Sequence, residues 1–194
     1  MGSVAALTRA VERRDPYARG HADRVTELAI AIGRRFGLAG ERLEELRLGA
    51  RLHDVGKLAV AHGVLLKPGA LTTSELVQVR AHPRVGARLV GASDDLRGAL
   101  PYVLYHHERW DGGGYPEGRA GEAIPLGARI LAVADAFDAM TCDRPYRRAR
   151  PVGHALAELF RCAGSQFDPQ VVSAFLEAWE AGEIETRVPA AAAS

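Results

Sequence analysis

The chain has 194 residues, of which 47% are hydrophobic and 25% are charged, and its formal net charge is +1. These values predict one ordinary globular domain and exclude the strong electrostatic field with which proteins attract polymeric nucleic acid or anionic membranes. No apolar run approaches the roughly 20 residues of a membrane span, and no secretory signal pattern is present, so we expect a cytoplasmic protein. An anionic ligand is therefore expected to be a small molecule that meets locally placed cations.

Apolar residues recur at helical spacing along most of the chain, and alternation of period two is almost absent, which predicts an all-α fold. Glycine and proline mark most of the expected helix ends. Thr72 and Glu75 have the spacing of a capping box, and Asp168 stands at an N-cap position before Pro169. In chain order, we expect helices over residues 4–14, 21–36, 41–55, 73–82, 85–90, 96–107, 125–142, 151–163 and 169–180.

The third of these helices is expected to end in His53 and Asp54, with Gly56 as the residue that stops it. Adjacent helical residues are about 100° apart, so this imidazole and carboxylate are close enough to converge on one metal ion. Lys57 follows, and it is one of only two lysines among 25 basic residues. Where arginine is otherwise preferred, a lysine indicates a need for a compact, strongly hydrated point charge. Taken alone, the stretch fits equally well a helix C-terminus with a cation near its negative end.

Five of the seven histidines fall at expected helix ends instead of on apolar stripes, namely His21, His53, His82, His106 and His107. Any one of them alone would be interpreted as an ordinary hydrogen-bonded histidine. With Asp54 and Asp135 they are more ligands than one tetrahedral ion uses, and the lack of cysteine ligands argues against a structural zinc site. We therefore predict two divalent ions with Asp54 as a bridge, a clamp that suits in-line displacement at phosphorus. Mixed imidazole and carboxylate ligation favours iron or manganese and indicates zinc less specifically.

A second dense stretch runs from Glu108 to Pro116. Its three consecutive glycines oppose a helix and permit close approach of the main chain, so we expect an organised loop. On the helix expected after it, Asp135 and Asp138 lie one turn apart.

With these motifs in place, the chain resembles the HD-GYP domains, the branch of the HD phosphohydrolase superfamily that hydrolyses cyclic di-GMP. The resemblance covers roughly residues 15–175, and the long central motif is highly specific. It implies an HD-domain helical bundle with additional C-terminal GYP helices over residues 15–182, after an N-terminal helix or extension at 1–14 and before a disordered tail at 183–194. The matching motifs are His53-Asp54-Val55-Gly56-Lys57, His82-Pro83, His106 to Pro116, Arg129-Ile130 through Asp135, Arg144-Pro145-Tyr146-Arg147 and Gln166-Phe167-Asp168-Pro169.

The resemblance also implies a role for each site residue. Lys57 would contact the scissile phosphate and, with Asp54, would be catalytic, while Arg144 and Arg147 would hold phosphate and guanine of the substrate. Family members that bind three metals carry a glutamate where this chain has Tyr17, so two ions are expected. One ion would be bound by His21, His53, Asp54 and Asp135, and the other by Asp54, His82, His106 and His107.

The function that we expect from the resemblance is metal-dependent hydrolysis of cyclic di-GMP to linear pGpG, with the choice between pGpG and GMP as the end product left open. Two other functions stay open. One is a non-hydrolysing cyclic di-GMP receptor that signals through a partner, and the other is a phosphohydrolase of another nucleotide or cyclic dinucleotide. A homodimer and contacts with partner signalling proteins are compatible with either.

Overall fold

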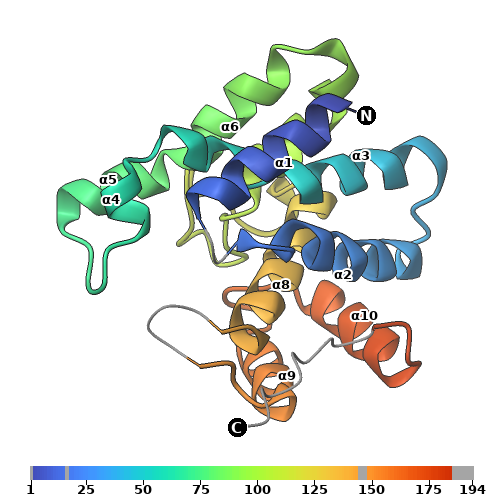
Figure 1. The fold of residues 1–194 in the computed structure, drawn as a ribbon. Coiled ribbons are helices and arrows are strands. Elements are labelled where there is room, and N and C mark those ends of the chain that lie inside the picture. The colour runs from blue at the N-terminus through green and yellow to red at the C-terminus, as the bar shows by residue number, and fades with distance from the viewer. Residues whose placement is uncertain (1, 16–17, 144–147, 185–194) are drawn as a thin grey trace, which may run out of the picture.

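The computed structural model describes residues 2–15, 18–143 and 148–184, and within these ranges the main chain forms helices and no strand (Figure 1). The predicted all-α fold is confirmed. None of the helices described is long and apolar enough to cross a membrane. In chain order the elements are α1 (Gly2–Arg14), α2 (His21–Arg35), α3 (Gly40–Leu52), the 3-10 helix η2 (Val55–Ala59), α4 (His62–Leu65), α5 (Thr73–Arg80), α6 (His82–Gly91), the 3-10 helix η3 (Asp94–Ala99), α7 (Leu100–Tyr105), the 3-10 helix η4 (Gly121–Ala123), α8 (Leu126–Thr141), α9 (Val152–Arg161) and α10 (Pro169–Glu180).

The described helices enclose two larger hydrophobic cores and a small cluster of Tyr105, Ile124 and Ala128, and α3 contributes buried residues to both larger cores. The larger core is formed by α2, α8, α9 and α10, with Leu46 and Ala50 of α3. The smaller core is formed by α1, α6, η3 and α7, with Leu52 at the end of α3 and Val55 at the start of η2. In Figure 1, α1 and α6 accordingly lie toward the top and α8, α9 and α10 toward the bottom, with α2 between them.

Three predicted helix boundaries are confirmed in detail. Gly37 has a φ of 69°, the left-handed conformation that closes a helix, just after the end of α2. Thr72 and Glu75 form the reciprocal capping box of α5. The side chain of Asp168 accepts a main-chain hydrogen bond in the first turn of α10 and caps that helix.

The end of α3 differs from the prediction. The helix ends at Leu52, His53 is its C-cap, and Asp54 leads into η2, so Gly56 does not stop α3. Gly56 instead allows η2 to touch α6, because a Cβ atom on this residue would lie 1.9 Å from the carbonyl oxygen of His82. Any side chain would push the two elements apart, so the glycine is required for close packing.

Two other predicted helices differ from the structure next to prolines, since one ends early and one is divided. The helix expected over 73–82 ends before His82, which begins α6 with Pro83 in its first turn. The helix expected over 96–107 consists of η3 followed by α7, which has Pro101 in its first turn. Proline lacks the N–H that would bond to the preceding turn, so it starts a helix more readily than it continues one.

Candidate metal centre

The predicted metal ligands come from separate segments whose helix ends point toward one region. His21 is the first residue of α2, His53 is the C-cap of α3, and His82 is the first residue of α6. His106 is the C-cap of α7, and Asp135 lies within α8. All four of these histidines are buried, with exposed fractions of 6% or less.

Three of the histidines are oriented by main-chain carbonyls. In each case Nδ1 donates a hydrogen bond to the carbonyl three residues earlier, at a helix end where carbonyls lack a helical partner. The pairs are His53 with Ala50 (2.7 Å), His82 with Val79 (2.7 Å) and His106 with Val103 (2.8 Å). Because Nδ1 carries the hydrogen in the neutral ring, Nε2 has the free lone pair, and it is Nε2 that faces the site.

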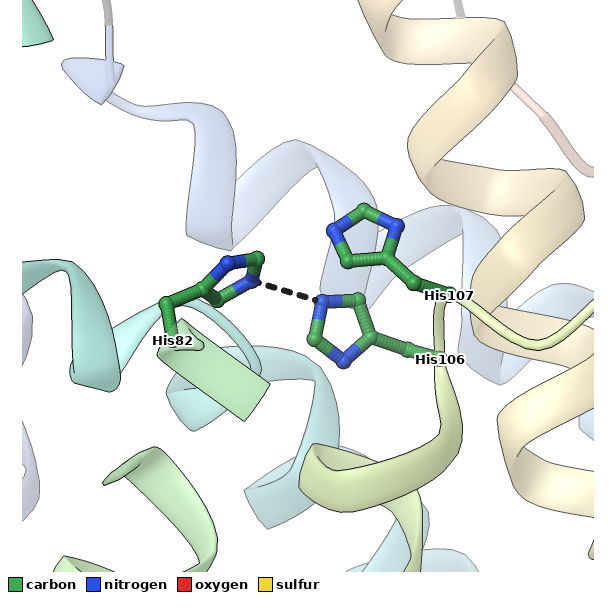
Figure 2. Close-up of side chains that lie close together, drawn as sticks. All are labelled: His82, His106 and His107. Carbon is green, nitrogen blue, oxygen red and sulfur yellow. Dashed lines mark hydrogen bonds between the residues drawn. The ribbon is translucent and has the colours of Figure 1, made fainter. Parts of the chain in front are cut away.

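The Nε2 atoms meet in pairs. Those of His82 and His106 are 3.3 Å apart, the contact drawn as a dashed line in Figure 2, and those of His21 and His53 are 3.2 Å apart. Burial lowers the pKa of His82, and burial together with the neighbouring His107 lowers the pKa of His106 much further, so both rings are neutral. Two lone pairs that face each other at this distance repel, whereas a cation bound by both would hold them together.

Asp54 lies between the two pairs and turns one oxygen toward each. Its Oδ1 lies 3.4 Å from Nε2 of His82, while its Oδ2 lies 3.5 Å from Nε2 of His53 and 3.8 Å from Nε2 of His21. Burial alone would raise the pKa of Asp54, but the charge of Lys57 beside it outweighs burial and holds the pKa well below its usual value. The carboxylate is therefore anionic and faces both pairs of imidazoles.

These donor atoms fit two divalent ions. Ligand atoms bonded to one ion at about 2.1 Å lie roughly 3.0–3.4 Å apart at octahedral or tetrahedral angles, and the spacings in the site run from 3.2 to 3.8 Å. Donor atoms within 4.8 Å of one another form two sets, which are His21, His53 and Asp54, and His82, His106 and His107. Asp135 extends the first set, since its Oδ1 lies 3.4 Å from Nε2 of His21. Imidazole and carboxylate donors of this kind suit divalent iron, manganese or zinc.

Two residues to which the sequence assigned no role hold His21 in place. Asp138 is buried and accepts hydrogen bonds from Nδ1 of His21 at 2.7 Å and from Nε of Arg24 at 2.5 Å. Burial would lower the pKa of His21, but the hydrogen bond with Asp138 and the charges of Asp135 and Asp54 outweigh it and raise the pKa. A carboxylate behind a histidine ligand fixes the tautomer of the ring and strengthens it as a donor. In the sequence, the one-turn spacing of Asp135 and Asp138 on α8 was the signal that could have identified Asp138.

Lys57 lies on η2 beside Asp54, the carboxylate between the two pairs of histidines. Its Nζ donates a hydrogen bond to Oδ2 of Asp54 at 2.7 Å. Burial would lower the pKa of Lys57, but the charge of Asp54 outweighs it and raises the pKa, so the ammonium group stays charged at neutral pH. The side chain is 21% exposed, which leaves it accessible to an anion from solvent.

The glycine-rich loop between α7 and α8 lines one side of the site. Tyr115 stacks on the ring of His107 with centroids 4.8 Å apart, and the guanidinium of Arg80 lies 5.4 Å from the centroid of the tyrosine ring. Burial lowers the pKa of His107 to about 3, so this ring is neutral as well. A Cβ atom on Gly114 would lie 2.4 Å from the main-chain nitrogen of Arg109, which confirms the expected close approach of the main chain.

A buried carboxylate organises this loop from inside. Glu108 is 3% exposed and accepts three main-chain hydrogen bonds, from the N–H groups of residues 117–119. The C-terminal motif holds the loop from behind, because the N–H of Trp110 donates to the carbonyl of Gln166 at 3.1 Å. Two distant motifs of the sequence therefore serve one loop.

Some predicted residues lie outside the part of the chain that the structure describes. They are Arg144, Arg147 and Tyr17, together with residues 185–194 of the expected tail.

Comparison with known proteins identifies relatives for most of the chain. The family model of the HD domain matches residues 5–171. The chain is 44% identical over 177 residues to the cyclic di-GMP phosphodiesterase response regulator RpfG of Xanthomonas campestris, a match that covers 90% of this chain and 47% of that protein. It is 39% identical over 168 residues to a cyclic di-GMP phosphodiesterase of Thermotoga maritima, with 86% and 46% covered. It is 35% identical over 175 residues to 3′3′-cGAMP-specific phosphodiesterase 3 of Vibrio cholerae, with 90% and 38% covered. The chain thus spans about half the length of these relatives or less.

Solved structures share the fold. A cyclic GMP-AMP specific phosphodiesterase of V. cholerae superposes with a TM-score of 0.68 at 22% identity, covering 91% of this chain and 48% of that one. The HDGYP protein Bd1817 of Bdellovibrio bacteriovorus superposes with a TM-score of 0.64 at 20% identity, covering 86% and 53%. At these identities the likeness establishes the helical architecture.

Proposed function

The chain belongs to the HD domain family, with the motifs of its HD-GYP branch, and from this premise we propose that it hydrolyses cyclic di-GMP to linear pGpG and then to GMP in a metal-dependent reaction. The proposal draws on relatives that are named for this reaction, on the two sets of imidazole and carboxylate donors, and on the charged lysine beside them. We also propose that the ligand set binds two ions and that the metal is iron or manganese.

The observation that carries the proposal is the position of Asp54. Its two oxygens face different pairs of imidazoles, at 3.4 Å from His82 and at 3.5 Å from His53. A single carboxylate between two sets of imidazole donors is the arrangement that a bridged pair of cations requires. A core histidine cluster satisfied by hydrogen bonds alone would not aim the lone pairs of its rings at one another.

The reaction needs charge to be stabilised on both sides of the scissile bond. Two divalent ions held by these donors would supply Lewis-acid stabilisation for the attacking and leaving oxygens of a phosphodiester displacement. The ammonium group of Lys57 adds a fixed positive charge beside Asp54, where negative charge would develop on the phosphate. Asp138 keeps His21 in the tautomer that presents Nε2 to the site.

A cyclic dinucleotide carries two phosphates, and a chain of net charge +1 can bind it only with cations placed at the site. Lys57 and Arg80 supply such charges near the donors. We assign Arg144 and Arg147 to substrate phosphate and guanine on the basis of the sequence resemblance. Tyr115, stacked on His107, offers an aromatic wall to the same space.

A second substrate, 3′3′-cGAMP, is a candidate because one of the relatives is named for it. The two cyclic dinucleotides have the same phosphodiester chemistry and differ in one base, so the choice between them depends on base recognition. A receptor that binds cyclic di-GMP without hydrolysis is less well supported, since it would need neither opposed imidazole lone pairs nor a lysine held at their shared carboxylate.

The test is metal analysis of anaerobically purified protein, coupled to chromatography of the products formed from cyclic di-GMP and from 3′3′-cGAMP. We expect about two ions per chain and metal-dependent formation of pGpG before GMP. Faster hydrolysis of 3′3′-cGAMP would select the second substrate. Two bound ions with both substrates left intact would favour a receptor, and failure to bind any divalent ion would refute the metal site.

A further inference from the structure

Helix α1, which carries none of the predicted ligands, forms the back of the metal centre. Thr8, Val11 and Glu12 of α1 line a small cavity whose other walls include His53 and Asp54. In Figure 1 this helix runs across the upper part of the molecule, beside the end of α3 and next to α6. The side of α1 that faces the protein therefore lies directly behind the donors.

The last residue of α1, Arg14, reaches the segment that carries Lys57. Its Nη1 donates a hydrogen bond to the carbonyl of Leu58 and its Nη2 to the carbonyl of Val60, both at 2.8 Å. These carbonyls lie at the C-terminal end of η2, where main-chain acceptors lack helical donors and attract a positive charge. Since Gly56 packs against α6, η2 is held on one side by α6 and on the other by Arg14.

The same end of α1 is fixed to a second segment of the site. Glu12 accepts a hydrogen bond from the N–H of Gly20 at 2.8 Å, and Gly20 is the N-cap of α2, immediately before His21. The C-terminal end of α1, which binds η2, is thus also attached to the start of α2. This second attachment restricts movement of η2 and of Lys57, which η2 carries.

Charge pairing does not explain the placement of Arg14. Among the described residues it forms no ion pair, and its Nε is buried without a hydrogen-bond partner. Taking a guanidinium group out of water without a carboxylate partner costs free energy. The contact instead positions η2, because two donors of one rigid planar guanidinium group fix both the position and the orientation of the turn that they bind.

We propose that Arg14 is a positioning residue for Lys57, which keeps the ammonium group beside Asp54 by fixing the C-terminal end of η2. This inference rests on the proposed role of Lys57 in phosphodiester hydrolysis. A displacement of about 1 Å at a reacting centre can cost about a hundredfold in rate. Arg14→Ala should therefore lower kcat toward cyclic di-GMP by roughly ten- to a hundredfold, with a much smaller change in KM and unchanged metal content. Arg14→Lys, which keeps one charged donor, should recover part of the rate.

The first test does not depend on catalysis. Lys57 and Lys67 are the only lysines of the chain, and each donates to a carboxylate, at 2.7 Å to Asp54 and at 2.6 Å to Glu75. Competitive acetylation followed by peptide mass spectrometry therefore gives the reactivity of Lys57 with Lys67 as an internal reference. In metal-free Arg14→Ala protein the ratio should rise by about threefold or more, and in Arg13→Ala, an exposed change on the same helix, it should stay at the wild-type value. Arg14→Lys should give a ratio between those of the wild-type protein and Arg14→Ala. An unchanged ratio in folded Arg14→Ala protein would overturn the proposal.

The second test is a double-mutant cycle on kcat. If Arg14 acts through Lys57, Arg14→Ala should cause no further loss in a Lys57→Ala background, with folding of each variant checked by thermal unfolding. An equal loss in both backgrounds would show that Arg14 acts elsewhere and would refute the positioning role. Should the wild-type protein hydrolyse neither cyclic dinucleotide, the proposed function fails, while the labelling ratio still decides whether Arg14 holds the lysine.

Discussion

Replacement of Asp54 by asparagine tests the bridging arrangement with almost no change of shape. The variant keeps one oxygen acceptor, but it loses the negative charge and the second oxygen that faces the other pair of imidazoles. In the wild-type protein this carboxylate lies 3.4 Å from Nε2 of His82, 3.5 Å from Nε2 of His53 and 2.7 Å from Nζ of Lys57. Removing one partner of a buried charge pair costs about 3–5 kcal/mol, which corresponds to roughly a hundredfold to several thousandfold in affinity. We therefore expect Asp54→Asn to bind at most one ion per chain at micromolar metal and to lose hydrolysis of cyclic di-GMP.

The assay is reconstitution of chelated, metal-free protein with Mn²⁺ under anaerobic conditions, with free and bound metal measured by elemental analysis. Asp23→Asn is the matched control, because Asp23 is an exposed carboxylate on α2 that pairs with Arg51 at the surface. The control should bind the same number of ions as the wild-type protein. Two ions retained by Asp54→Asn with wild-type affinity would refute the bridging role and, with it, the geometric basis of the proposed function.

Other changes separate chemistry, recognition and stability. Lys57→Ala should depress hydrolysis of cyclic di-GMP and of a generic activated phosphodiester alike while the metal content stays constant, because a charge at the reacting phosphate stabilises the transition state of both. Arg144→Ala should lower kcat/KM for cyclic di-GMP by roughly ten- to a hundredfold and spare the generic substrate, since a charge-assisted hydrogen bond contributes about 1.5–3 kcal/mol; equal impairment of both substrates would contradict a recognition role. Asp138→Asn should weaken metal binding at His21 by roughly ten- to a hundredfold, as measured by competition with a chelator. In metal-free protein the pKa of His107 is lowered from 6.5 to about 3, so the unfolded chain takes up a proton below pH 6.5 that the folded protein does not. The contribution of His107 to stability is therefore complete well above pH 6.5 and falls by about 2 kcal/mol between pH 6.5 and 5. Urea unfolding of His107→Gln should show a loss over this range that is smaller than the wild-type loss by about that amount.

The sequence predicted the helical fold and the helix boundaries that depend on neighbouring residues. The capping box of Thr72 and Glu75 and the cap at Asp168 are local devices, so their spacing alone identifies them. The grouping of histidines with Asp54 was also predictable, because several histidines at expected helix ends together with a carboxylate are typical of a cation site. The role of Gly56 was not predictable, since a glycine that ends a helix and a glycine that admits a neighbouring helix have the same local sequence.

The residues that the sequence did not assign act across long distances in the chain. Asp138 supports His21 from α8, and Arg14 binds carbonyls of the turn that carries Lys57. No spacing rule links such pairs, because tertiary packing alone brings them together. An arginine that binds two main-chain carbonyls is especially hard to foresee, since its partners have no side-chain signature. The three-dimensional structure therefore mainly identifies the residues that support the predicted ligands, and it adds less to the list of ligands itself.

The two sets of donors are attached to different hydrophobic cores. His21 and Asp135 extend from α2 and α8 of the larger core, while His82 and His106 extend from α6 and α7 of the smaller one. Asp54 follows α3, which places buried residues in both cores. The separation of the two sets is consequently fixed by how the cores meet along α3, and close-packed cores change such a separation only in discrete steps. The carboxylate at this junction is thus the one donor whose position both cores determine, which is the position that a bridging ligand needs.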